Sequence, residues 1–149
     1  MSIVKDTDKG WKRITRKIFA LNGKIVSAGI HTDAGTEKNG VSIAQVAVYN
    51  EFGTKRIPSR PFIRLSYENH KKEWGDVADA QLTAMVNSGK TASGALSAVG
   101  RRMKKDIVSI IGDTSQLRHN APSTIARKGF DKPLYETGRL KAAIDFKVK

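Results

Sequence analysis

The sequence predicts an α+β fold in which a small antiparallel sheet packs with three to four helices. Apolar residues recur at helical spacing in several stretches, most clearly from about Ala92 to Ile111. Two short segments alternate apolar and polar residues as half-buried strands do, one at 24–30 and one at 142–148. The 149 residues show no internal repeat and no break in composition. A single domain covering residues 1–149 is therefore expected.

The first helix and the first strand are indicated by residue spacing and by a stop signal. Trp11, Ile14 and Ile18 follow the period of one helical face, and basic residues occupy the opposite side. Asn22-Gly23 is expected to end this helix, because both residues tolerate a positive φ. The alternating residues 24–30 then form the first strand.

A loop and a second helix follow the first strand. Residues 33–40 are polar and Gly-rich, which predicts a flexible loop. Ser42 and Gln45 have the spacing of a capping box, so the second helix is expected to begin there. Gly53 is well placed to cap the end of this helix. Two prolines then favour an extended path for the residues that precede them: Pro58 and Pro61.

The second half of the chain predicts a helical hairpin, an irregular segment and a closing strand. One helix is expected from about Tyr67 to Asn87-Ser88-Gly89, and the next over 92–111. The loop between them is short, which favours antiparallel packing of the two helices. Residues 112–134 contain scattered Gly and Pro with weak periodicity, which predicts a long, flexible and largely irregular segment. The closing strand is expected to pair with the first.

The chain is strongly basic, with a net charge of +13 and a pI near 10.2. Such an excess favours acidic partners. The positive residues are spread over four groups: Lys12, Arg13, Arg16 and Lys17; Lys55, Arg56, Arg60 and Arg64; Arg101, Arg102, Lys104 and Lys105; and Arg127, Lys128 and Lys132. Charge that is dispersed in this way is typical of a solvated surface. Contact with nucleic acid therefore stays open as an alternative, and such contact would not depend on the base sequence.

Several classes of protein are disfavoured by the composition. There is no Cys, which excludes disulfides, thiolate metal sites and cysteine nucleophiles. No apolar run has membrane-spanning length, and the opening MSIVKDTDKGWKR lacks the apolar core of a secretory signal. We therefore expect a soluble protein that is made inside the cell and has no membrane partner.

No group of residues indicates a catalytic, cofactor or metal site. The three histidines are far apart in sequence, and His31 with Asp33 is weak evidence for a metal. Asp76 and Asp79 lack the His or third acid that paired carboxylates need for chemistry, and they suit the solvated start of a helix. Gly53-Thr54-Lys55 lacks the upstream Gly and the following helix of a phosphate loop. We expect no enzymatic activity, no cofactor and no metal.

Five aromatic side chains have two alternative uses, in the core or as platforms on which nucleic acid bases stack: Trp11, Phe52, Phe62, Tyr67 and Trp74. The core is the commoner place for aromatics in such patterns. Phe62 is either a core residue or an interface anchor. Arg60 and Arg64 flank it, and in an extended segment these two side chains point to the same side. This edge is predicted to contact another subunit.

Two segments carry a family likeness. VAVYNEFGTKRIPSRPFIR resembles the EFGT…IPxRPF signature of small tailed-bacteriophage and prophage morphogenesis proteins, and APSTIARKGFDKPLYETGRLKAAI resembles the PL-x-x-TG-x-L element of the same group. These are the tail-completion and neck proteins, of the HK97-type tail-completion or phage virion morphogenesis kind. The likeness covers roughly residue 20 to the end. The first motif matches Glu51, Phe52, Gly53, Pro58, Arg60, Pro61 and Phe62, and the second matches Pro133, Leu134, Thr137, Gly138 and Leu140.

The resemblance implies a structural virion protein that acts in tail completion and joins head to tail as part of a neck ring. It would assemble in the host cytoplasm, and its partners would be copies of itself, neighbouring head-closure, connector or tail proteins, and packaged DNA. The interface predicted on this basis comprises Phe52, Lys55, Arg56, Pro58, Arg60, Pro61, Phe62 and Arg64. A tail-terminator ring and a basic DNA-binding module are the alternatives. Phe62→Ala or Arg60→Glu is expected to block ring assembly while the monomer stays folded.

Overall fold

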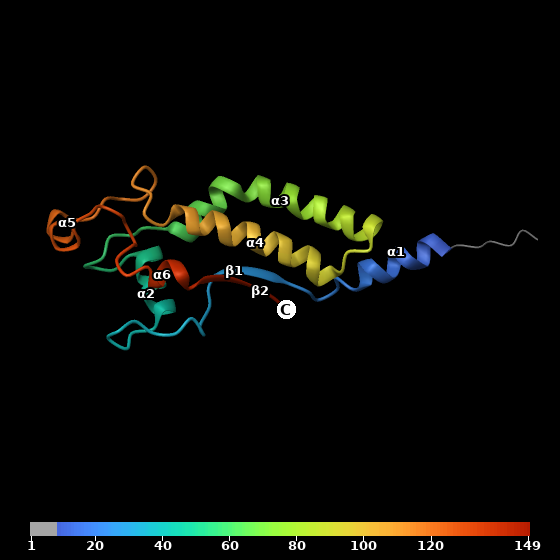
Figure 1. Cartoon of the computed structure of the whole chain (residues 1–149), viewed down its shortest axis with the longest axis horizontal. Coiled ribbons are helices and arrows are strands. Elements are labelled where there is room, and N and C mark those ends of the chain that lie inside the picture. Colours follow the sequence, from blue (N-terminus) through green and yellow to red (C-terminus); the bar gives the residue numbers. More distant parts are fainter. Residues whose placement is uncertain (1–8) are drawn as a thin grey trace, which may run out of the picture.

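The computed structural model describes residues 9–149 and consists of a helical hairpin on a two-stranded sheet, with shorter helices at both ends (Figure 1). The elements are α1 (Lys9–Phe19), β1 (Val26–Ile30), α2 (Ile43–Phe52), α3 (Phe62–Ser88), α4 (Ala92–Ile110), α5 (Pro122–Lys128), α6 (Arg139–Ala142) and β2 (Ile144–Val148). This arrangement is a small α+β fold, as the sequence predicts.

The sheet is formed by the two strands that the sequence predicts. β1 and β2 are antiparallel, with Val26 opposite Val148 and Ile30 opposite Ile144. Ile144 is fully buried, whereas its neighbour Asp145 is exposed, as expected for a half-buried strand. The closing strand is shorter than predicted, since Ala142 belongs to α6.

α3 and α4 form the predicted antiparallel hairpin, and α4 lies over the sheet (Figure 1). Gly89 ends α3 in the left-handed conformation with φ 77°, and the Thr91 hydroxyl accepts a hydrogen bond from the Gly94 amide at the start of α4. The sheet approaches α4 closely at Gly100, where an added Cβ would lie 2.3 Å from the Phe146 ring. A larger residue at this position would force the strand away from the helix.

Two boundaries differ from the prediction. α3 begins at Phe62 and not near Tyr67, because Pro61 keeps only the residue before it out of the helical conformation and leaves the following residue free to start a turn. The segment 112–134 is largely irregular as predicted, but it contains the short helix α5, which was not predicted. Its signals are local: Pro122 opens the helix, and Gly129 closes it with φ 78°.

The predicted capping box at the start of α2 is not formed. Ser42 is the residue before the helix but makes no side-chain cap hydrogen bond. The Ile43 amide instead donates to the Gly35 carbonyl, and the Gln45 amide group bonds forward to the Tyr49 hydroxyl at 2.6 Å. Residues 33–40 form turns, with an isolated bridge between Thr36 and Ser42. The backbone of this loop therefore supplies an acceptor for the Ile43 amide.

The aromatic residues divide between the core and the surface. Phe62 and Trp74 are buried in the core with Ile107, Ile110 and Ile144, as predicted for core aromatics. The prediction was wrong for three others, which are exposed: Trp11, Phe52 and Tyr67. Within residues 9–149, no helix has both the length and the apolar character needed to span a membrane.

α1 projects from one end of the hairpin, as Figure 1 shows at the right of the molecule. Lys17 ties it to the body by donating to the Met85 and Val86 carbonyls at 2.6 and 3.0 Å. These are carbonyls of the last turns of α3, which favour a cation. Ile18 and Phe19 remain exposed, Phe19 to 74%. Ile18 borders a hollow lined by Leu82 and Val86 of α3, so Phe19 is the more exposed of the two apolar side chains.

Candidate functional site

The first motif forms a tight corner between α2 and α3. Gly53 ends α2 with φ 77°, and a Cβ there would lie 3.0 Å from the Ser59 amide and 3.1 Å from the Ile57 carbonyl. Glycine is therefore required both by the backbone angle and by the space. The Thr54 hydroxyl accepts hydrogen bonds from the amides of residues 56 and 57, which folds the basic loop back on itself.

The side chain of Glu51, which belongs to α2, caps the first turn of α3. Its carboxylate is buried and accepts hydrogen bonds from the Ile63 and Arg64 amides, each at 2.9 Å. Pro61, which precedes the helix, has no side-chain oxygen to offer these amides. A carboxylate from α2 therefore does for α3 what a capping residue ordinarily does, at the positive end of the helix dipole.

Glu51→Gln is expected to lower the free energy of unfolding by about 1–3 kcal/mol, because an amide group offers one acceptor oxygen where a carboxylate offers one to each of two partly buried N–H groups. Chemical denaturation would measure the change. Glu73→Gln is the matched control, since Glu73 is exposed on the same helix. Its expected effect is within about 0.5 kcal/mol. Equal effects from the two variants would contradict the capping role of Glu51.

Arg60 lies inside the corner and not at a docking edge. It is 9% exposed, and its guanidinium donates to the Arg118 and His119 carbonyls, each at 2.9 Å. Its own amide bonds to the Asn50 carbonyl at 2.7 Å. Burial lowers the pKa of Arg60, and the nearby charge of Arg118 lowers it further. The prediction of Arg60 as an exposed contact was wrong, because its polar groups are used to hold the chain together.

The structure also corrects the interface role predicted for Phe62. Its side chain is 0% exposed and packs in the core, which decides between the two roles left open for it. Because the chain is helical from Phe62 onward, Arg60 and Arg64 do not share a pleat. Arg64 instead lies over the Phe52 ring at 5.1 Å and donates to the Glu51 carbonyl at 2.9 Å.

The second motif packs against this corner. Pro133 and Leu140 are buried, and Gly138 precedes α6 with φ 78°. One cleft of about 210 Å³ is lined by both motifs, with Asn50 and Arg60 on one side and residues 134–140 on the other. Thr137 also belongs to this lining and accepts a long hydrogen bond from the amide of residue 139. The two signature segments, far apart in sequence, therefore build one structural unit.

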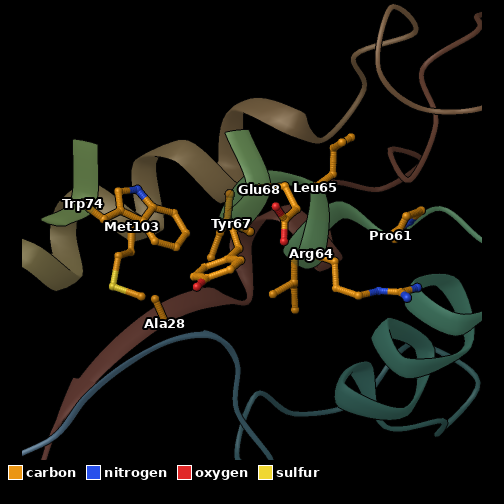
Figure 2. A pocket seen from close by; sticks show the side chains of 10 residues that line it. Ala28, Pro61, Arg64, Leu65, Tyr67, Glu68, Trp74 and Met103 are labelled. Carbon is orange, nitrogen blue, oxygen red and sulfur yellow. The ribbon is translucent and has the colours of Figure 1, made fainter. Parts of the chain in front are cut away.

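Beside the corner lies an apolar hollow of about 710 Å³ between α3, α4 and β1. Figure 2 shows Tyr67, Trp74 and Met103 around this space, Ala28 at its lower edge, and Arg64 extending toward α2. Phe52, 65% exposed, and Val48 continue the apolar surface onto α2. Lys55, Arg56 and Pro58 stay exposed on the adjoining loop. Exposed apolar surface of this kind marks an interaction site.

The described residues show little that resembles a catalytic or metal site. Over residues 9–149, no three His, Cys, Asp or Glu side chains gather as metal ligands would. Asp33 forms an ion pair with Lys147. Within the described residues, Asp33 and His31 are not part of any group that could hold a metal ion. His119 and Asp131 lie 2.5 Å apart, but Asp131 also accepts hydrogen bonds from the Asn120 amide and side chain. This pair holds the loop before α5.

Comparisons with family models, with curated proteins and with solved structures each found no match to this chain.

Proposed function

We propose that this chain is a structural subunit of a tailed phage or prophage virion, and that copies of it form a ring at the neck, where head joins tail. The observation that carries the proposal is the corner itself. The two segments that resemble the phage signatures fold into one unit, and an exposed apolar surface lies at its edge. A subunit needs such a rigid, exposed surface more than it needs a reactive group.

One side of the ring contact is the corner face, by which we mean Phe52, Arg64, Tyr67 and the apolar hollow beside them. The other side is the exposed surface of α1 on the next copy. Phe19 supplies its most exposed apolar side chain, and its charged residues are all Lys or Arg. α3, which borders the hollow, carries the exposed acidic residues Glu73, Asp76 and Asp79, while its Glu68 is paired with Lys71.

The two surfaces lie apart on the molecule, with α1 beyond one end of the hairpin and the corner near the other (Figure 1). Two copies that join different surfaces make a heterologous contact, which closes into a ring or continues as a filament. The hydrogen bonds of Lys17 hold α1 at its own end, so α1 is available to a neighbour and not to the hollow of its own chain. This geometry favours a ring over a simple two-fold dimer.

The purified chain is expected to give a discrete mass that is a multiple of the 16.3 kDa monomer, measured by native mass spectrometry and light scattering. A species that stays monomeric at high concentration, with and without tail or connector proteins, would contradict the ring. Labelled protein located in imaged particles at the head–tail junction would support the neck position. Recovery on tails purified without heads would favour the tail-terminator alternative.

A further inference from the structure

The fold brings together two basic regions that are far apart in sequence. Arg56 and Arg60 come from the corner loop, and Arg118 comes from the segment between α4 and α5. They line one cleft of about 650 Å³, which we call the basic cleft. Its lining is Arg56, Ile57, Pro58, Arg60, Arg118, His119, Asn120, Ala121, Pro122 and Thr124.

The charged side chains that line the basic cleft are all arginines. Its lining contains no Asp or Glu. One carboxylate borders the cleft, since Asp131 binds the lining residues His119 and Asn120, whereas Glu136 binds Arg127. Burial lowers the pKa of the adjacent Lys128, the Glu136 carboxylate opposes this shift, and the positive charges of Arg127 and Arg60 add to it. Cations held this close together attract an anion strongly.

We propose that the basic cleft binds the phosphate groups of duplex DNA. Arg56 and Arg118 are exposed, so their guanidinium groups are available for the paired hydrogen bonds that arginine makes to phosphate. Arg60 is fixed by backbone carbonyls and adds charge at the base of the cleft. Thr124 adds a hydroxyl group, which is a common phosphate contact.

Duplex DNA suits the basic cleft better than single-stranded nucleic acid or an acidic protein. Binding of single strands relies on aromatic side chains that stack on bases, and the lining contains no Phe, Tyr or Trp. Arginine forks with a hydroxyl match the tetrahedral phosphate groups that repeat along a duplex. Phosphate contacts carry no sequence information, so binding is expected to be independent of sequence. This activity goes beyond a ring subunit and is measured on the isolated chain, so either proposal can fail alone.

The test is fluorescence anisotropy with a short mixed-sequence duplex at several salt concentrations. Arg56→Gln/Arg118→Gln removes the two exposed arginines of the basic cleft. Arg101→Gln/Lys105→Gln is the matched control, because it removes two exposed cations from α4 that belong neither to the basic cleft nor to the proposed ring contact. The cleft variant is expected to bind at least about tenfold more weakly and to reduce the salt slope by about 2, because each arginine neutralises one phosphate. The control is expected to keep most of the affinity and slope.

Three results would overturn the proposal. One is the absence of salt-dependent duplex binding by the wild-type chain. Another is an equal loss of affinity in the two double variants, which would mean that binding is spread over the whole surface. The third is binding of polyglutamate as tight as binding of the duplex, which would indicate an acidic protein partner. Thermal melting of both variants should match the wild type, because neither changes a side chain that holds the fold.

Discussion

Phe62→Ala is expected to lower the free energy of unfolding by about 3–5 kcal/mol, the range for removing a large side chain from a packed core. Phe62 is fully buried at the first position of α3. The deleted ring would leave a cavity among residues that include Ile107, Ile110 and Ile144. A domain of this size is typically stable by about 5–15 kcal/mol, so much of the stability would disappear. Urea denaturation followed by circular dichroism would measure the change.

Phe52→Ala is the matched control for this prediction, because it changes the same residue type in the same motif. Phe52 is 65% exposed, so its truncation is expected to alter the free energy of unfolding by no more than about 0.5 kcal/mol. It is expected to weaken assembly instead. Wild-type stability of Phe62→Ala together with failure to assemble would restore the interface role first predicted for Phe62. A large fall in the stability of both variants would mean that Phe52 also supports the fold.

The hairpin and the sheet could be predicted from the sequence because their signals are local. The stripe on α4 repeats at the helical period, and Ile107 and Ile110 on it are buried. Gly89 ends α3 where the pattern places the stop. The signals of α5 are equally local, since Pro122 and Gly129 bracket it. It was missed because its seven residues contain too few apolar positions to show a period.

The inside of the corner could not be predicted, because its contacts join residues that are distant in sequence. Glu51 has the polarity of an exposed helix end, yet its carboxylate caps a helix that starts eleven positions later. Arg60 bonds to carbonyls 58 and 59 residues away. A charged residue buried by long-range contacts looks like a surface residue in any local pattern. The end of α2 at Gly53 was predicted correctly, but the exposed docking role predicted for Arg60 and Phe62 was wrong.

The basic residues show the same limit. Each group looks like an ordinary solvated surface in the sequence, and no spacing rule relates Arg56 to Arg118. These two become neighbours only because Arg60 ties the corner loop to the segment before α5. By joining these two segments, Arg60 places the positive charges of Arg56 and Arg118 along one cleft. The basic cleft and the corner depend on the same side chain.

Phe19→Ser and Phe52→Ser, mixed in equal amounts, are expected to form dimers and nothing larger, although neither variant assembles alone. Each variant lacks one of the two surfaces of the proposed ring contact. In the mixture, the intact α1 of the Phe52→Ser chain meets the intact corner face of the Phe19→Ser chain. The remaining two surfaces of that dimer are both defective, so growth stops at two copies. Native mass spectrometry of the mixture and of each variant would measure this.

The mixture and the two single variants together separate a heterologous contact from a two-fold one. If α1 bound α1 of a partner, Phe52→Ser alone would still dimerise through its intact α1. If the corner bound a corner, Phe19→Ser alone would do so. Ile25→Ser is the control, because it removes an exposed apolar side chain that belongs to neither surface and should leave the ring unchanged. Full rings from either variant alone would show that its phenylalanine lies outside the contact.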